Sequence, residues 1–308
     1  MIQLNRLYRF FGATRAVDDV SFEVQAGEVF GYIGPNGAGK TTSMRILSTL
    51  DEPTSGDAYV DGFSVVDDPD RVRTRLGFMP DYFGTYANVN VREYLDFFAR
   101  SYGLRGGERS RAIEYVMDFT LLNRLSEKPI NALSKGMKQR LCLGRALIHD
   151  PAVMILDEPA AGLDPRARIE LREMIGKLAE VGKAVLISSH ILTELAEMCH
   201  TVGIIEQGKL LAVGTVDEMR KQAQSLSMVR ITVVGGGGPL GQWLAARDEI
   251  AKVDVDGEVV VISHSGDRQS EVALLREIVE SGYPVAEFQV DAKSLEDVFL
   301  HVTEGRVQ

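Results

Sequence analysis

Cysteine, tryptophan and long apolar runs are scarce in this sequence. The chain of 308 residues has one tryptophan and two cysteines, Cys142 and Cys199, which lie far apart and form no CxxC pair. This pattern disfavours a disulfide or metal role and indicates a reducing compartment, with the cytoplasm as the default. The longest uninterrupted apolar run, 152–156, is far shorter than the roughly 18 residues of a membrane helix. The start, MIQLNRLYRFFG, lacks the long apolar stretch of a signal peptide, so we expect none.

Positive charge is also in deficit. The chain has 34 Lys and Arg residues and 44 Asp and Glu residues, which gives a formal net charge of −10. The excess of acidic residues is concentrated in 225–308. Because proteins that bind a phosphate backbone usually carry a basic surface, we expect no nucleic-acid partner.

The order of apolar segments predicts an α/β fold with two domains. Residues 1–218 alternate strand-like and helix-like segments, and the apolar runs 152–156 and 184–188 are typical of buried parallel strands. About 85–150 is wholly helical in pattern, which indicates a helical subdomain. A polar connector at 219–227 leads to a β-α-β-β-α-β pattern, which predicts a small ferredoxin-like α+β domain with an accessory role at 228–308.

A glycine-rich turn follows the first apolar strand-like run. GPNGAGKTT, residues 34–42, fits G-x-x-x-x-G-K-[ST] and lies between a predicted strand and a predicted helix, which is the P-loop arrangement. Glycines allow successive N–H groups to turn towards an anion, and the helix adds the positive end of its dipole. Lys40 is expected to reach the β- and γ-phosphates, Thr41 to offer its hydroxyl to Mg²⁺, and Thr42 to lie near the α-phosphate. The predicted phosphate-binding set is Gly34, Pro35, Asn36, Gly37, Ala38, Gly39, Lys40, Thr41 and Thr42.

Two carboxylates end the buried strand PAVMILDEP at 151–159. Asp157 and Glu158 therefore fall at the carboxyl edge of the predicted sheet, where α/β proteins bind ligands. Acidic residues after a strand are more often solvated turn residues, but a P-loop upstream favours a functional role. Asp157 is suited to hold Mg²⁺ through water, and Glu158 to activate a water for attack on the γ-phosphorus.

Two further motifs support a family resemblance over about residues 1–218. ALSKGMKQRLCLGRALIHDP, residues 132–151, and DEPAAGLDP, residues 157–165, resemble the signature loop, second carboxylate motif and D-loop of ATP-binding cassette (ABC) ATPases. The resemblance implies that Ser134 and Gly136 contact the γ-phosphate held by the opposite subunit, although Ser134 alone could be a simple helix N-cap. It also implies that Asp164 is the D-loop aspartate and that His190 is the switch histidine.

The resemblance also assigns adenine stacking to Phe11, with Tyr8 and Phe10 less favoured, although each ring could instead pack in a core. Three positions depart from the family pattern: 81, 135 and 137. Asp81 stands where the family usually has Gln, and the signature reads LSKGM where LSGGQ is common. A carboxylate at position 81 could still approach Mg²⁺, so we retain Asp81 as a candidate metal contact. MPDYFG and the later SLEDVFLHVT resemble the branch that serves multidrug, antibiotic, lipid or polysaccharide exporters.

The resemblance implies an ATPase that uses ATP and Mg²⁺ to drive transport through a separate integral membrane permease. It also implies a homodimer, or pairing with a second ATPase subunit, and a cytoplasmic location on the inner face of the cell membrane. The alternative is a non-transport ABC ATPase that acts on ribosomes or DNA. The single cassette, the lack of a long coiled-coil insertion and the acidic tail disfavour it. A small-molecule P-loop kinase would leave LSKGM and AAGLDP unexplained.

Overall fold

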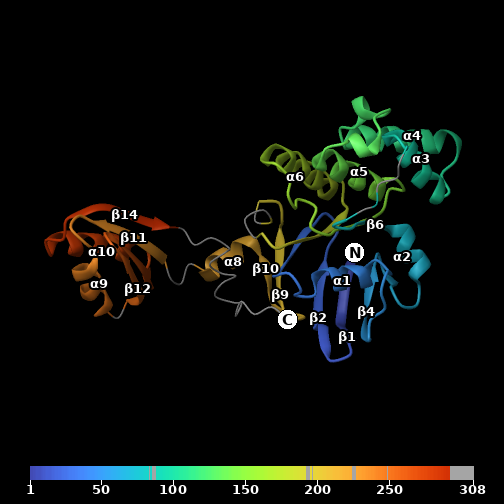
Figure 1. The fold of residues 1–308 in the computed structure, drawn as a ribbon. Coiled ribbons are helices and arrows are strands. Elements are labelled where there is room, and N and C mark those ends of the chain that lie inside the picture. The colour runs from blue at the N-terminus through green and yellow to red at the C-terminus, as the bar shows by residue number, and fades with distance from the viewer. Residues whose placement is uncertain are drawn as a thin grey trace. The chain divides into compact units, whose positions relative to one another are not determined.

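The computed structural model divides into two compact units between Thr215 and Val216 (Figure 1). It describes residues 1–82, 84, 88–191, 195, 197–223, 227–247 and 249–291, and within these ranges no helix is long and apolar enough to span a membrane. The backbone alone is described at 220–223, 227 and 291.

A six-stranded sheet forms the centre of the first unit. Its strand order is β10-β9-β3-β8-β7-β6, and all neighbours are parallel except β10, which is antiparallel to β9. The parallel strands are short apolar runs that are largely buried, as expected for a sheet covered on both faces. Their bounds are β3 (Val29–Ile33), β6 (Leu76–Met79), β7 (Val153–Leu156), β8 (Ala184–Ser189), β9 (Thr201–Glu206) and β10 (Lys209–Thr215).

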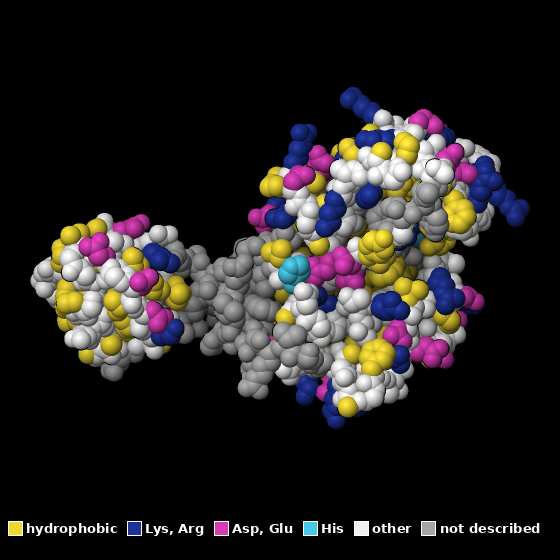
Figure 2. All heavy atoms as spheres, in the orientation of Figure 1, with side chains coloured by type: hydrophobic (Ala, Val, Ile, Leu, Met, Phe, Trp, Pro, Cys, Tyr) yellow, Lys and Arg dark blue, Asp and Glu magenta, His cyan; other side chains and the backbone are white. Residues whose placement is uncertain are grey.

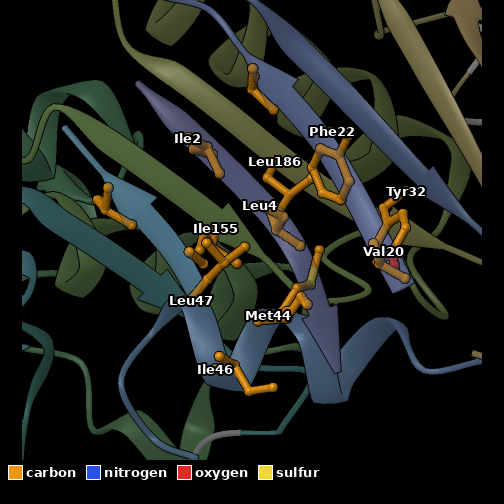
Figure 3. Close-up of a cluster of buried hydrophobic side chains, with 14 of the residues drawn as sticks. Ile2, Leu4, Val20, Phe22, Tyr32, Met44, Ile46, Leu47, Ile155 and Leu186 are labelled. Carbon is orange, nitrogen blue, oxygen red and sulfur yellow. The ribbon is translucent and has the colours of Figure 1, made fainter. Parts of the chain in front are cut away.

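A second, antiparallel sheet has the order β2-β1-β4-β5. Its bounds are β1 (Ile2–Phe11), β2 (Thr14–Val24), β4 (Ser55–Val60) and β5 (Phe63–Ser64). Figure 3 shows the core where side chains of this sheet meet those of α1 (Lys40–Leu47) and the parallel strands. Leu4, Tyr32, Met44 and Leu47 are fully buried there, and this packing fixes α1 against the sheet.

Helices fill the chain between β6 and β7. The cluster of α3, α4 and α5 packs together, and the part of 80–152 that the structure describes contains no regular strand (Figure 1). Asn90 and Glu93 form a capping box that fixes the start of α3. Besides α1, the helices described in the first unit are α2 (Pro69–Arg75), α3 (Val91–Ser101), α4 (Gly106–Phe119), α5 (Lys135–Leu147) and α6 (Pro165–Glu180), with 3-10 turns η1 (Asn123–Leu125) and η2 (Ile130–Ala132).

The second unit is a four-stranded antiparallel sheet with helices. Its order β12-β13-β11-β14 and its β-α-β-β-α-β sequence give the predicted ferredoxin-like fold, so the α/β fold class and the smaller α+β unit are both confirmed. Its core includes Ile231, Leu240, Ile262 and Leu274. The elements are α8 (Val216–Ala223), β11 (Ser227–Val233), α9 (Gly238–Ala245), β12 (Ile250–Asp256), β13 (Val259–His264), α10 (Arg268–Glu280) and β14 (Val285–Asp291).

Helix α8 differs from the polar connector that the sequence predicts at 219–227. Residues up to Ala223 are helical. Asp217 and Glu218 in the first turn complement the helix dipole, and the residues that follow are good helix formers. The polarity of this stretch therefore reflects a polar helix rather than a loop.

Candidate nucleotide-binding site

The loop 34–42 joins the carboxyl end of β3 to the first turn of α1. Gly37 and Gly39 have φ of 82° and 107°, in the left-handed region that favours glycine. A Cβ at Gly34 would collide with the carbonyl oxygen of Ile205, and one at Gly39 with that of Ala16. The chain therefore needs glycine at these positions to bring its backbone into this shape.

Helix α1 begins without a side-chain cap. Its N-cap residue is Gly39, and the first i to i−4 hydrogen bond is the one that Ser43 N–H donates to Gly39 O. The N–H groups of residues 40–42 precede that bond and have no intrahelical acceptor. Thr41 is exposed and Thr42 is half-buried. This helix start is suited to bind an anion.

Lys40 is the buried cation of the loop. Its side chain is 6% exposed, and Nζ donates to Gly34 O at 2.6 Å and to Pro35 O at 3.1 Å. Burial lowers the pKa of Lys40, and the carboxylates of Glu158 and Asp157 oppose that effect. An anion beside the ammonium would stabilise its charged form.

The end of β7 places two carboxylates side by side in the chain. Asp157 is 2% exposed, and its backbone N–H donates to Met79 O of the neighbouring β6 at 2.8 Å. Its Oδ1 accepts a hydrogen bond from the Ser188 hydroxyl at 2.5 Å, and that same Oγ accepts the Glu158 N–H at 2.9 Å. Glu158 has φ 48°, which is uncommon for a residue other than glycine.

Glu158 links the loop to the end of β8. Its Oε2 lies 2.9 Å from His190 Nδ1, and its Oε1 lies 3.8 Å from Lys40 Nζ. Oε1 is buried and has no hydrogen-bond partner among the described residues. The structure thus brings together Lys40, Asp157, Glu158 and His190, which come from separate parts of the sequence. Figure 2 shows acidic side chains gathered beside a histidine on this unit.

The signature and D-loop residues lie together at the starts of α5 and α6. Ser134 is the N-cap of α5, and its Oγ accepts the Met137 N–H at 3.3 Å. Asp164 is the N-cap of α6, and its Oδ1 accepts the Ala167 N–H at 2.9 Å. A Cβ at Gly136 would lie 3.1 Å from the Ala167 Cβ, so glycine permits the close approach of these two helix starts. These contacts are all local to α5 and α6.

The structure shows where the unusual lysine of the signature, Lys135, lies. Its Nζ occupies the space into which a side chain at Gly162 would project, and Gly162 has φ 65°. The lysine of LSKGM therefore lies along the loop that carries Asp164. Ser134 and Gly136 keep their positions on either side of it.

Asp81 and Phe11 are among the predicted site residues that lie on the surface. Asp81 is exposed and follows β6, whose carboxyl end adjoins that of β7. Phe11 is 50% exposed at the end of β1, and the Arg9 guanidinium lies 4.4 Å from its ring centroid. Tyr8 and Phe10 form an edge-to-face pair with centroids 6.0 Å apart. An exposed ring with a cation on one face is available for stacking on the other.

Ser188 is the residue that sequence reasoning missed. It is fully buried and bonds to both Asp157 and Glu158. The available signal was a polar SS pair that ends an apolar strand, LISSH at 186–190. In a parallel sheet, such residues lie at the same edge as the carboxylates of the neighbouring strand.

The residues present fit a magnesium-bound triphosphate. The glycines form a cradle that side chains would fill, Asp157 is a buried carboxylate at the strand end, and Glu158 Oε1 lacks a hydrogen-bond partner within the described ranges. Over those same ranges, no group of three or more His, Cys, Asp or Glu side chains could hold a metal ion. Mg²⁺ differs from zinc in this respect, because one or two carboxylates together with substrate phosphates are enough to bind it.

A glycine loop with a buried lysine, a helix start without a side-chain cap and a neighbouring carboxylate strand together define a P-loop nucleotide-binding protein. The family model described as ABC transporter matches residues 17–161, and the model for the C-terminal domain of DrrA1-3-like ATP-binding proteins matches residues 214–303.

Relatives and solved structures agree with this match. The chain is 30% identical to the linearmycin resistance ATP-binding protein LnrL of Bacillus subtilis, over 98% of each chain. It is 34% identical to the bacitracin transport ATP-binding protein BcrA of Bacillus licheniformis, over 99% of this chain and 98% of that protein. A solved ATP-binding subunit of an ABC transporter has a TM-score of 0.66 and 31% identity, over 72% of this chain and 93% of that one. The chain belongs to the family of ABC transporter ATP-binding proteins.

Proposed function

We propose that this ABC ATPase binds ATP with Mg²⁺ at the loop 34–42 and uses the hydrolysis to drive export through a separate integral membrane permease. The observation that carries the proposal is the contact set of Glu158, which lies 2.9 Å from His190 Nδ1 and 3.8 Å from Lys40 Nζ. This set combines a cation that can bind a phosphate with a carboxylate that can activate a water.

Each residue of the set has a defined task. Lys40 balances the charge of the β- and γ-phosphates. Glu158 accepts the proton of the attacking water, and His190 holds the Glu158 carboxylate in place. Mg²⁺, when bound, would neutralise charge on the phosphates. Thr41 and Asp157 are the proposed metal contacts, with Asp81 as a further candidate at the same edge.

We further propose that two ATP sites form between two ATPase subunits, either two copies of this chain or this chain and a second ATPase. Ser134, Gly136 and Asp164 lie at the starts of α5 and α6, and their described contacts leave them outside the cluster of Lys40 and Glu158. They would act on the ATP held by the other subunit, while Phe11 stacks on the adenine. A dimeric bacterial ABC transporter cassette that is 26% identical, with a TM-score of 0.64 over 70% of this chain and 99% of that one, supports this arrangement.

Export and location are inferred from the relatives. Their names include linearmycin resistance, bacitracin transport and, in Ralstonia nicotianae, Nod factor export, with 33% identity over 98% of this chain and 94% of that protein. We place the chain in the cytoplasm, on the inner face of the cell membrane through the permease. The unit after Thr215 would be an accessory domain, with the boundary near residue 218.

Glu158→Gln tests the proposal most simply. The amide keeps the shape of the side chain but cannot accept the proton of water, so ATP hydrolysis should fall about 100- to 10,000-fold. ATP affinity, measured by equilibrium binding, should stay close to that of the wild type. Hydrolysis near the wild-type rate would remove Glu158 from this role. The same binding measurement on a chain that ends at Thr215 tests the domain boundary, because such a chain should retain ATP affinity.

A further inference from the structure

Ser188 is a fully buried hydroxyl at the end of β8, next to two site carboxylates. Its Oγ lies 2.5 Å from Asp157 Oδ1 and 2.9 Å from the backbone nitrogen of Glu158. An ionised carboxylate can only accept and an amide N–H can only donate. The hydroxyl proton is therefore directed to Asp157, and a lone pair of Oγ receives the Glu158 N–H.

These two bonds act on two adjacent residues, one on a side chain and one on the backbone. The bond to Oδ1 fixes the rotation of the Asp157 carboxylate, and the bond to the amide fixes the plane between Asp157 and Glu158. Glu158 has φ 48° in that position, a conformation that non-glycine residues adopt rarely and that the surroundings must hold. Its carboxylate then meets both His190 and Lys40.

We infer that Ser188 is a positioning residue for ATP hydrolysis: through one oxygen it orients the Asp157 carboxylate towards Mg²⁺ and holds Glu158 for the attacking water. This inference rests on the proposed function. Groups that orient metal ligands typically change metal affinity or activity about 10- to 100-fold when they are removed. Ser188 is fully buried and its hydroxyl bonds to the Asp157 carboxylate and the Glu158 N–H, so we expect its effect to pass through these two residues.

Ser64 provides a control, because its hydroxyl makes the same kinds of hydrogen bond as that of Ser188 but none of them is with the site residues. Ser64 in β5 is 6% exposed, its hydroxyl donates to Asp57 Oδ2 at 2.7 Å, and its Oγ accepts backbone N–H groups of residues 66 and 67. Ser64→Ala therefore removes a hydrogen bond of a buried serine to a half-buried aspartate in the antiparallel sheet. A purely structural role for Ser188 predicts the same consequences for both alanine variants.

The test compares the full-length wild type with Ser188→Ala, Ser188→Cys, Ser188→Thr and Ser64→Ala. Binding of the fluorescent nucleotide mant-ATP is measured in EDTA and over a Mg²⁺ titration, and ATP turnover is measured separately. For Ser188→Ala and Ser188→Cys we expect mant-ATP affinity in EDTA within about twofold of wild type. The Mg²⁺ concentration for half-maximal tightening should rise, and kcat should fall, about tenfold or more. Cysteine preserves the volume and is a weak donor, so it carries the comparison if the alanine variant does not fold.

Ser188→Thr keeps the hydroxyl and should restore kcat towards the wild-type value, whereas Ser64→Ala should leave both the Mg²⁺ titration and kcat unchanged. Wild-type kcat and Mg²⁺ response in Ser188→Ala or Ser188→Cys would overturn the inference, and so would equal losses in Ser64→Ala. A wild-type chain that binds mant-ATP but hydrolyses no ATP would instead overturn the proposed function, so the two failures are distinguishable.

Discussion

Helices α1 and α5 start in different ways, although both begin at predicted ATP-contacting loops. The N-cap of α1 is Gly39 in the left-handed region, with no side-chain cap. The N-cap of α5 is Ser134, whose hydroxyl oxygen accepts the Met137 N–H. The first start leaves its N–H groups for a phosphate, whereas the second satisfies one of its own N–H groups and presents an exposed serine.

The lysines at the two helix starts also differ in burial and in their neighbours. Lys40 in the first is buried and lies near the Glu158 carboxylate, so charge, base and backbone donors are gathered within one chain. Lys135 in the second is exposed and lies along the loop at Gly162. Under the proposed function, the first start would form half of a site with its own chemistry, and the second would contact a phosphate held by the other subunit. The three predictions below test this contrast in order of expected effect.

Substitutions at the start of α1 should have the largest effects, and two neighbours should separate shape from charge. Gly39→Ala requires an alanine at φ 107° and a Cβ that collides with Ala16 O, so it should lower the free energy of unfolding by about 2 kcal/mol or more and abolish ATP binding. Lys40→Ala should weaken ATP binding about 10- to 100-fold. Because burial disfavours the Lys40 charge, its removal should leave the thermal midpoint nearly unchanged.

Calorimetric unfolding and equilibrium ATP binding, measured on both variants, check this pair. Full ATP affinity in Gly39→Ala would show that the shape of the loop is not needed. A Lys40→Ala variant with unchanged affinity would show that the lysine only satisfies the carbonyls of Gly34 and Pro35, to which it donates in the structure.

Ser134→Ala at the start of α5 should have smaller effects on stability and ATP binding, and its main effect should be on hydrolysis. Loss of the cap should cost about 1 kcal/mol of stability, and ATP affinity of the single chain should not change. Steady-state hydrolysis should fall if, as proposed, the serine acts on the ATP of the other subunit. Asp267 offers the control, since it caps α10 in the second unit and accepts the Gln269 and Ser270 N–H groups. Asp267→Ala should cost similar stability with no change in hydrolysis; equal hydrolysis in both variants would reduce Ser134 to a cap.

Asp81→Asn should have the smallest effect on hydrolysis. Asp81 follows β6, at the carboxyl edge of the parallel sheet, where α1 also starts. The residue is exposed, and exposed charge interactions are worth roughly 0.2–1 kcal/mol, so the Mg²⁺ concentration for half-maximal hydrolysis should rise about two- to fivefold. Asp70→Asn, at an exposed carboxylate of α2 paired with Arg73, provides the control. A Mg²⁺ titration that is the same in wild type, Asp81→Asn and Asp70→Asn would leave Asp81 as a solvated surface residue.

The sequence was sufficient to predict those features that depend on residues close together along the chain. The spacing of Gly34, Gly39 and Lys40 predicted a strand, loop and helix, and the structure has them. The β-α-β-β-α-β pattern after residue 227 predicted the second sheet, because strand and helix periods are themselves local. The contacts of Ser188 with residues 157 and 158 were not predictable, because they cross between strands about thirty positions apart in sequence.

Helix α8 and the backbone of Glu158 illustrate two other limits. Polarity alone does not distinguish an exposed helix from a loop, so 219–223 was assigned to a connector although it belongs to α8. The φ of 48° at Glu158 is held by the surrounding hydrogen bonds, and the residue types near Glu158 do not predict it. Ser134 and Gly136 were predicted to contact the ATP of another subunit, and the structure of one chain shows only their local contacts at the starts of α5 and α6.

Subunit complementation tests the central claim, that Lys40 of one chain and Ser134 of another meet on the same ATP. Lys40→Ala and Ser134→Ala homodimers should each be nearly inactive. In a mixed dimer both changes fall in one site and the other site is intact, so mixing with proven subunit exchange should restore hydrolysis to at most about a quarter of wild type if the sites act independently. ATP binding at the restored site, measured alongside, covers the case of strongly coupled sites. Restored hydrolysis or binding supports the shared site, whereas the absence of both would contradict it.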